Sequence, residues 1–402
     1  MPIGLADFAA GVRIVIAHEP NVFHARKIPP GESPGNDCAW VAHGRKYVNC
    51  VANRARGDFN TPVVSPKYFP SETDLTGNGT HQAALHERAR AVTREFFGRA
   101  VFVRGVIEVS NFCRQNCAYC GMRRDNRTLA RYRARHEQLA ELLVNHRPSS
   151  ITDVNIQAGE DPVAVREVVL PLIRTLRRET TLGISVCLGS LTPGLYDELR
   201  SAGAGIYIIK FEVSDAPSYE RLEAPGTLAE RLQNIRHLAH AGWQVSSGFI
   251  GGLPGQTVQD LVASLHLANE LPLRGCSVSP FVAGEDAPLR GGPPSNANWT
   301  LNTMAALRLM RPDWVIPAVS ALNLATHDGY RRGLAAGANL TTINLTPAGL
   351  REDYIIYKRE RFIMTEERVL SAIAAEGLIP SPTSLVEYYG NGAAPEATAS
   401  AG

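Results

Sequence analysis

The stretch VIEVSNFCRQNCAYCGMRRDN, residues 106–126, leads from an apolar, β-branched run directly into three cysteines. Cys113, Cys117 and Cys120 have the spacing C-x3-C-x2-C, in a chain that holds only seven cysteines. An odd cysteine count in a long chain argues against a disulfide framework and favours reduced thiols that act as ligands or nucleophiles. The three thiols, placed directly after a predicted strand, are therefore the first indication of both fold and chemistry.

The apolar run before the cysteines is the first of eight, and segments with helical periodicity separate these runs. Strands that alternate with helices predict a parallel sheet, and eight such units predict an α/β fold of the (β/α)8 TIM-type barrel class. Barrel chemistry lies where the strands end, so the residues after each run are the first candidates for a site. The expected strands are residues 100–109, 151–159, 182–190, 204–213, 244–252, 275–283, 314–322 and 338–347.

The segments on either side of the barrel lack this alternation. We interpret residues 1–80 as an irregular N-terminal extension, because Gly, Pro and Asn are spread through it without a sustained period. The barrel is expected over residues 81–378. Residues 379–402 form a C-terminal tail that is small and polar at its end, and we expect it to be partly disordered.

Composition excludes some classes of protein. The chain has 402 residues, 44% of them hydrophobic, and a formal charge of +2 with its basic residues scattered. It can bury a full core, and it lacks the dense basic stripe of a nucleic-acid-binding protein. No apolar run is long enough to span a bilayer, and the start does not follow the pattern of a secretory signal. We therefore expect a cytoplasmic protein that binds neither nucleic acid nor a membrane.

Three thiolates on one loop can hold three corners of a 4Fe–4S cube and leave the fourth iron open. Electron-transfer clusters use four cysteines and structural zinc sites use four ligands, so the missing fourth cysteine leaves a coordination position for a group that is not protein. Two other interpretations remain open. The thiols could bind zinc with a distant fourth ligand, or they could be small buried core residues.

This spacing, with Tyr119 before the third cysteine and after the first strand of a barrel, resembles the radical S-adenosylmethionine (SAM) superfamily. The resemblance implies one 4Fe–4S cluster on Cys113, Cys117 and Cys120, with SAM bound to the open iron. It also implies reductive cleavage of SAM to a 5′-deoxyadenosyl radical that removes a hydrogen atom from a small-molecule substrate. An electron donor such as flavodoxin or ferredoxin would supply the electron.

The same resemblance assigns the remaining SAM contacts to strand ends and one helix. Gly159 and Glu160 would receive the methionine ammonium, and Arg231 would pair with the methionine carboxylate. Glu212 would bind the ribose. The adenine side would be formed by the residues that allow close approach or cover the cluster, namely Gly251, Gly252 and Tyr119.

Residues from about 82 to 378 resemble one group of this family, which contains the FeFe-hydrogenase maturase, methylornithine synthase and biotin synthase. Biotin synthase carries a second cluster on cysteines of its inner strands, but Cys187 is the one cysteine at such a position in this chain. We therefore expect a single cluster. Cys187 is then most simply a small buried residue.

The predicted pocket departs from the maturase pattern. Where that pattern has two arginines and a histidine on the fourth strand, this chain has Ile206, Lys210 and Phe211. A less cationic wall suggests a different ligand, because buried donors without partners cost roughly 1 to 3 kcal/mol each. We expect Lys210 to anchor a substrate carboxylate, or alternatively to be a structural partner of Glu212. The residues expected to shape the site are Ser185, Ser320, Thr342, Tyr354 and Tyr357.

These features predict an enzyme of the mutase or lyase type. It would abstract hydrogen from a small amino-acid-like metabolite, and carbon-skeleton rearrangement or carbon–carbon cleavage would follow, in specialised metabolism. Two alternatives from other classes remain. One is a hydrogenase-type maturase that acts on an iron-cysteine synthon, and the other is a non-catalytic scaffold that binds a cluster.

Overall fold

The computed structural model describes residues 2–8, 12–19, 22–28, 40–41, 68–292, 295–358 and 362–390. The chain divides into two compact units, residues 1–60 and 61–402. The first contains an antiparallel sheet in the order β1-β2-β3-β4, so the prediction of an irregular extension is wrong over these strands. Their β-branched residues favour extended backbone, and the Gly and Pro residues between them concealed the pattern. The strands are β1 (Pro2–Phe8), β2 (Val12–Glu19), β3 (Val22–Ile28) and β4 (Trp40–Val41).

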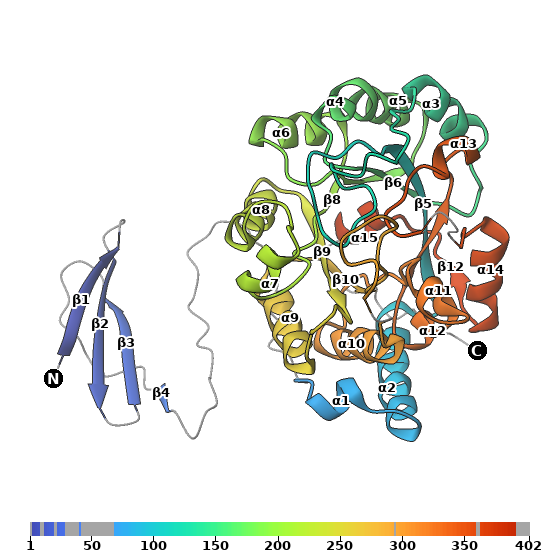
Figure 1. Ribbon diagram of the computed structural model, residues 1–402. Helices are drawn as coiled ribbons and strands as arrows, with labels where there is room; N and C mark the ends of the chain where they lie inside the picture. Colours follow the sequence, from blue (N-terminus) through green and yellow to red (C-terminus); the bar gives the residue numbers. More distant parts are fainter. Residues whose placement is uncertain are drawn as a thin grey trace, which may run out of the picture. The chain divides into compact units, whose positions relative to one another are not determined.

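The second unit is built on parallel strands in the order β10-β9-β8-β7-β6-β5-β11. Helices lie around the outside of these strands (Figure 1). All but one of the eight predicted strand positions form named strands, which confirms the predicted fold class. The strands are β5 (Ala100–Ser110), β6 (Asp153–Ala158), β7 (Gly183–Cys187), β8 (Ile206–Ile208), β9 (Gln244–Gly251), β10 (Gly275–Pro280) and β11 (Leu340–Asn344).

The remaining predicted strand, residues 314–322, closes the ring through isolated bridges. Val315 pairs with Gly275 of β10, and Pro317 pairs with Leu340 of β11, both in parallel register. Pro317 has no N–H to donate, so a continuous hydrogen-bonded strand cannot form through it. The eighth position of the barrel is therefore present but reduced to two isolated bridges.

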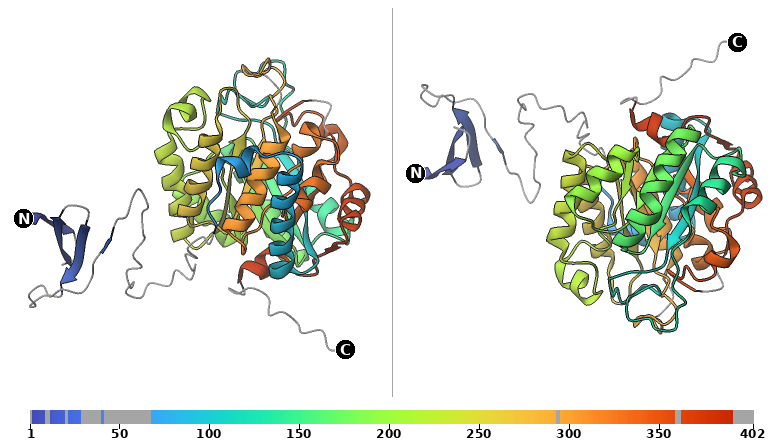
Figure 2. Two further views of the ribbon diagram at one scale, coloured as in Figure 1. Left: turned by 90° about the horizontal axis from the view of Figure 1, so that it is seen from below. Right: turned by 90° about the horizontal axis from the view of Figure 1, so that it is seen from above.

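Helices separate the strands along the chain, as the helical periodicity predicts. Thr227 starts one of them with a capping box, because its side chain accepts from the N–H of Glu230 while the Glu230 carboxylate accepts from the N–H of Thr227. A π-helical segment, Val165–Val169, joins α4 to α5. Helices α2 and α10 lie side by side (Figure 2). Among the described residues, no helix is both long and apolar enough to cross a membrane.

The helices are α1 (Glu72–Thr76), α2 (Thr80–Phe97), α3 (His136–Asn145), α4 (Pro162–Ala164), α5 (Leu170–Glu179), α6 (Pro193–Ala202), α7 (Ala216–Arg221), α8 (Leu228–His240), α9 (Val258–Glu270), α10 (Ala297–Met310), α11 (Leu322–Ala325), α12 (Gly329–Ala335), α13 (Ala348–Arg351), α14 (Glu366–Ala375) and α15 (Leu385–Gly390).

The lower end of the barrel, where the strands begin, is closed by a floor that we define as β12 (Ile379–Pro380) and α15. β12 pairs with the first residues of β5, and the N–H of Leu385 donates to Asp153 Oδ2 at 2.9 Å. Leu385 and Tyr389 pack in one apolar cluster with Phe102 and Leu340. The predicted tail is therefore ordered up to residue 390, and residues 391–402 lie outside the described part of the chain.

Arg308, on α10, supports the reduced eighth strand from outside. Its buried guanidinium donates to the carbonyl oxygens of Gly337, Pro312 and Trp314 at 2.8 to 2.9 Å, and to Asn339 Oδ1 at 2.9 Å. Burial lowers the pKa of Arg308 to about 10. The bonds hold the chain on both sides of residues 314–322, where the strand ladder is weakest.

Replacing Arg308 should therefore destabilise the barrel. Arg308→Ala leaves several buried carbonyl oxygens without a donor, and we expect it to lower the free energy of unfolding by about 3 kcal/mol or more. Arg166→Ala is the control, because Arg166 forms an exposed ion pair with Glu198 at 3.0 Å and such pairs contribute about 1 kcal/mol at most. Denaturant unfolding measures both variants, and equal losses would contradict the assigned role.

Candidate active site

The three cysteines lie on the loop that follows β5. Cys113, Cys117 and Cys120 are free thiols, and all are at least partly buried. Burial raises the pKa of each thiol, and the neighbouring thiols raise those of Cys117 and Cys120 further. A bound metal centre would reverse this, because a coordinated thiol is deprotonated. Within the described residues, no group of three His, Cys, Asp or Glu side chains could hold a single metal ion.

Arg131 holds this loop in place. Its Nη1 donates to the carbonyl oxygens of Asn111 at 2.6 Å and Met122 at 2.9 Å. Its Nη2 donates to those of Arg123 at 2.7 Å and Asn126 at 3.1 Å. These four acceptors lie on both sides of the cysteines, so one guanidinium ties the beginning of the loop to its end.

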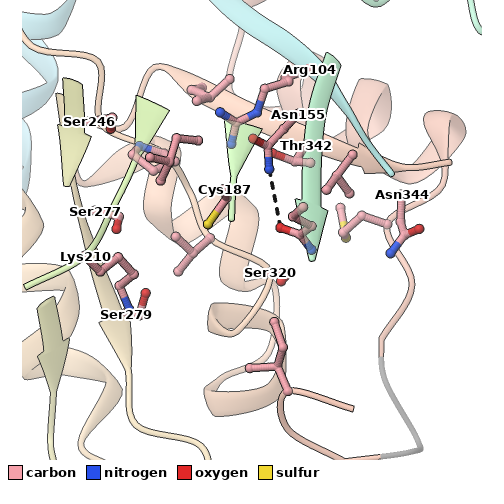
Figure 3. Close-up of a pocket in the computed structure, with 18 of the residues that line it drawn as sticks. Arg104, Asn155, Cys187, Lys210, Ser246, Ser277, Ser279, Ser320, Thr342 and Asn344 are labelled. Carbon is pink, nitrogen blue, oxygen red and sulfur yellow. Dashed lines mark hydrogen bonds between the residues drawn. The ribbon is translucent and has the colours of Figure 1, made fainter. Parts of the chain in front are cut away.

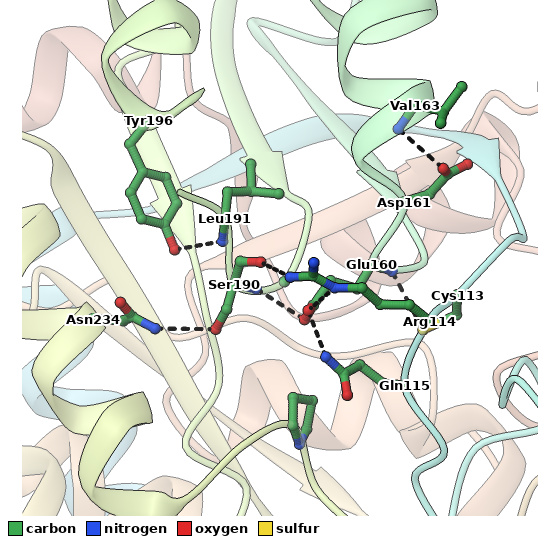
Figure 4. Close-up of polar contacts among 12 residues, drawn as sticks. Cys113, Arg114, Gln115, Glu160, Asp161, Val163, Ser190, Leu191, Tyr196 and Asn234 are labelled. Carbon is green, nitrogen blue, oxygen red and sulfur yellow. Dashed lines mark hydrogen bonds and ion pairs between the residues drawn. The ribbon is translucent and has the colours of Figure 1, made fainter. Parts of the chain in front are cut away.

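Glu160, directly after β6, connects the loop to two strand ends (Figure 4). Its Oε1 accepts from Arg114 Nε at 2.8 Å and from Gln115 Nε2 at 2.6 Å. Its Oε2 accepts from the N–H of Ser190 at 3.0 Å, and its own N–H donates to Cys113 Sγ at 3.3 Å. The carboxylate is only 4% exposed and already has three protein donors. Its first role is thus to fix the loop that carries Cys113.

Gly159 permits this close packing. A β-carbon at this position would collide with the carbonyl oxygen of Phe112 and lie 2.9 Å from the β-carbon of Cys113. Its N–H donates to the carbonyl oxygen of Ser110 at 3.0 Å. Glycine is needed here because the end of β6 lies directly against the cysteine loop.

Arg231, on α8, is a buried cation whose recorded side-chain hydrogen bond runs from Nε to the hydroxyl of Tyr219, at 3.1 Å. Burial alone would lower the pKa of Arg231, but Tyr219, Glu160 and Glu212 raise it on balance. No carboxylate forms an ion pair with it among the described residues. Its outer nitrogens are therefore suited to a carboxylate supplied by a ligand.

Glu212 follows β8 with a φ of 63°, a conformation that few residues other than glycine adopt. It is held there because its N–H donates to Gly248 and its carbonyl oxygen accepts from Ile250 of β9. Its carboxylate forms an ion pair with Lys210 at 3.0 Å. Burial would lower the pKa of Lys210, but Glu212 raises it on balance. The charge of Lys210 is thus matched inside the protein, which favours the alternative that it is a structural partner of Glu212.

Gly251 and Gly252 end β9, as the sequence predicts. Gly252 has a φ of 86°, and its N–H donates to Gln256 Oε1 at 2.6 Å. A side chain there would be strained and would collide with Ser295. Tyr119 lines the barrel cavity, and its carbonyl oxygen accepts from the N–H of Gly284 at 2.9 Å.

A cavity of about 330 Å³ lies inside the barrel (Figure 3). Of the predicted pocket residues, Lys210, Ser320, Thr342 and Tyr357 line it. Ser185 and Tyr354 do not. Ser185 is fully buried and donates to the carbonyl oxygen of Val154 and to Asn155 Oδ1, whereas Tyr354 packs in an apolar cluster behind the cysteine loop.

Other polar residues of the cavity were not predicted. Arg104 and Glu108 both project from β5, and Glu108 Oε1 accepts from Gln157 and from Asn344, each at 3.3 Å. Their spacing along a strand could have identified them, because residues four apart share one face. Both residues lie in the interior of β5, whereas most of the predicted site residues lie at or beyond strand ends. The further unpredicted lining residues include Asn155, Ser246, Ser277 and Ser279.

The sequence pattern that defines the Radical SAM superfamily matches residues 107–268. The FeFe hydrogenase maturase subunit HydE of Thermotoga maritima is 32% identical over 277 residues, which cover 68% of this chain and 78% of that protein. The 3-methylornithine synthase of Methanosarcina acetivorans is 26% identical, over 75% of this chain and 87% of that protein.

A crystal structure of methylornithine synthase superposes with a TM-score of 0.69 at 24% identity, covering 78% of this chain and 95% of that one. This likeness shows a shared fold. The identity to the maturase extends over two thirds of the chain, and the family match at residues 107–268 includes the cysteine loop. The chain therefore belongs to the radical SAM superfamily.

Proposed function

We propose that this radical SAM enzyme abstracts hydrogen from a small amino-acid-like metabolite enclosed in the barrel, and that carbon-skeleton rearrangement or carbon–carbon cleavage follows. The observation that carries the proposal is the cavity itself. It is bounded by Tyr119 of the cysteine loop and by Leu385 and Tyr389 of the floor. A closed barrel of this kind favours a small molecule over a protein or nucleic-acid substrate.

Enzymes of this family use a 4Fe–4S cluster and SAM, which supply a 5′-deoxyadenosyl radical for hydrogen abstraction. The donor set of this chain fits both groups. Cys113, Cys117 and Cys120 would hold the cluster, and Arg231 has unused donors for the methionine carboxylate. Glu212 would bind the ribose, and the Gly159–Glu160 backbone would lie beside the methionine ammonium.

The chain's own residues would position the substrate and exclude water. Arg131 and Glu160 keep the cysteine loop rigid, while the floor closes the far end of the cavity. Hydrogen abstraction requires the substrate to be held in a reactive orientation, which depends on a rigid loop and a closed cavity. The electron would come from a donor such as flavodoxin or ferredoxin in the cytoplasm. Arg124 and Arg127 are exposed on the cysteine loop, where they could attract an acidic donor.

A maturase that acts on an iron-cysteine synthon is the second candidate, and the 32% identity to HydE favours it. The pocket distinguishes the two. Ile206 and Lys210 stand where the maturase pattern has arginines, and Lys210 is paired with Glu212. A ligand of high negative charge would find less compensation here.

The cluster assignment predicts about four irons per chain after anaerobic reconstitution. Cys113→Ala, Cys117→Ala and Cys120→Ala should each lose the cluster, because three thiolates are the fewest that hold the cube in this arrangement. Cys187→Ala is the matched control, since Cys187 lines the cavity apart from the loop. Iron analysis and the visible spectrum measure the result, and about eight irons in the wild type would contradict a single cluster.

Glu160 and Arg231 should differ in their effects. Glu160→Ala removes the carboxylate that accepts hydrogen bonds from Arg114, Gln115 and the N–H of Ser190. We therefore expect lower iron content as well as weaker SAM binding. Arg231→Met should weaken SAM binding by about tenfold or more with iron unchanged. Glu198→Ala, which breaks an exposed ion pair, is the control. Full iron content in Glu160→Ala would show that the cysteine loop does not need the contacts of the Glu160 carboxylate to hold the cluster.

The reaction itself is tested by deuterium transfer. The reconstituted, reduced enzyme is incubated with SAM and uniformly deuterated amino acids, and 5′-deoxyadenosine is analysed by mass spectrometry. Deuterium in 5′-deoxyadenosine supports the proposed function. Cleavage of SAM that responds only to an iron-cysteine complex would favour the maturase, and the absence of 5′-deoxyadenosine under all conditions would favour a scaffold.

A further inference from the structure

Arg104 is a charged residue in the interior of the barrel that the proposed SAM site does not use. It projects from β5 into the cavity, and it makes no hydrogen bond or ion pair through its guanidinium with any residue that the structure describes. Its Nε is buried without an acceptor. An unpaired cation that is only partly exposed to water is costly, so its presence calls for a partner that is not part of the protein.

Within the described part of the chain, none of the nearby carboxylates forms an ion pair with Arg104. Asp153 lies beside Arg104 in register, and burial lowers the pKa of Arg104 while Asp153 opposes this. Asp153 Oδ2 accepts from Thr152 Oγ1 and from the N–H of Leu385, both at 2.9 Å, whereas its Oδ1 is buried without a hydrogen-bond partner. Glu212 is paired with Lys210. Glu108 accepts from two side-chain amides. Arg104 is thus left without an ion-pair partner among these groups.

The surroundings of Arg104 suit an anionic group. Thr342 of β11 lies beside it in register, and Asn155 of β6 lines the same end of the cavity. Figure 3 shows Arg104, Thr342 and Asn155 together, with Lys210 and Ser279 at the other end of the view. Thr342 can add a hydroxyl donor, while the planar guanidinium offers two parallel N–H donors to a planar acceptor.

The depth of Arg104 limits the shape of the occupant. Arg104 lies six residues before Ser110, the last residue of β5, which corresponds to roughly 20 Å along a strand. A molecule held at Arg104 must therefore be elongated if its other end is to approach the cysteine loop. Ile206, Ile208 and Val319 line the cavity and would contact an aliphatic middle.

We propose that Arg104 is the deep anchor of the substrate and binds its carboxylate, so that the far end of an elongated, monocarboxylate-bearing molecule points towards the cysteine loop. A single uncompensated positive charge matches a carboxylate better than a dianionic phosphate. Arg104 thereby takes the role that the sequence predicts for Lys210, whose charge Glu212 already matches. The identification of the bound molecule as the substrate rests on the proposed function.

Cys187 provides a reporter, because it lines the cavity and interacts electrostatically with both Lys210 and Arg104. Iodoacetate and iodoacetamide both alkylate a thiolate, with a C–S bond formed and iodide released, and they differ in carrying a carboxylate or a neutral amide. The holoenzyme is treated with each reagent, and alkylation of the Cys187 peptide is followed by mass spectrometry. Glutathione in the same solution gives the reference ratio of the two rates.

In the wild type, the ratio of iodoacetate to iodoacetamide rates at Cys187 should exceed that of glutathione by about tenfold, the effect of one charge-assisted contact. Arg104→Met should bring the ratio close to that of glutathione, and Arg104→Lys should restore part of it. Arg274→Met is the matched control, because Arg274 is a partly buried arginine outside the cavity that bonds to Gln244. An unchanged ratio in Arg104→Met would overturn the proposal.

If neither reagent reaches Cys187, the change in melting temperature on adding a carboxylate ligand tests the proposal instead. 6-Aminohexanoate should raise the melting temperature of the wild type and not that of Arg104→Met, whereas 6-aminohexan-1-ol, which lacks the carboxylate, should have no effect on either protein. Equal shifts in wild type and Arg104→Met would overturn the proposal. Neither measurement needs SAM or a reductant. A failed deuterium transfer would therefore refute the proposed reaction and leave the carboxylate anchor standing.

The melting temperature of the protein without ligand distinguishes a ligand-binding role of Arg104 from a structural one. Arg104→Met removes an unpaired, partly buried charge, so its melting temperature without ligand should equal or exceed that of the wild type. If Arg104 instead served to balance Asp153, the variant would unfold several degrees lower and keep the wild-type alkylation ratio. That pair of results would also overturn the proposal.

Discussion

The carboxylate of Glu160 is the contact on which the geometry of the cysteine loop most depends. The loop has no ladder of its own, and it would be free to move without a fixed point on the barrel. Glu160 joins the loop residues Arg114 and Gln115 to the backbone of Ser190, so the ends of β6 and β7 set the position of Cys113. Arg131 then fixes the rest of the loop through backbone carbonyls. The strand order of the barrel thereby determines where a cluster can sit.

Charge is distributed unevenly inside the cavity. Lys210 and Glu212 neutralise each other near the strand ends, and Glu108 accepts from neighbouring amides. Arg104 has no such compensation within the described residues. Arg308 gives a useful contrast, because it is more deeply buried and its donors meet protein acceptors. The protein itself meets the hydrogen-bonding capacity of Arg308, whereas that of Arg104 is left for a ligand under our proposal.

Much of the barrel could be predicted from sequence, because strands buried on both faces appear as apolar runs with helices between them. The cysteine spacing likewise identified the loop. Pro317 explains why one strand is reduced to bridges, an effect that periodicity cannot reveal. Arg104 was missed because its role depends on which partners are absent, and pairing between strands decides that. The floor was missed because Leu385 and Tyr389 are apolar residues in a short segment that packs only against the finished barrel.

The floor has a consequence for how the enzyme is made. α15 follows every barrel strand in the chain, and it packs against residues from β5, β8 and β11. A chain that emerges from the ribosome in order can pair its strands before α15 exists, since domains form progressively during synthesis. The nascent barrel would then be open at both ends for a time. Sealing of the cavity is therefore a late event in biogenesis, and water trapped among the inner strands has a route out until that last helix arrives.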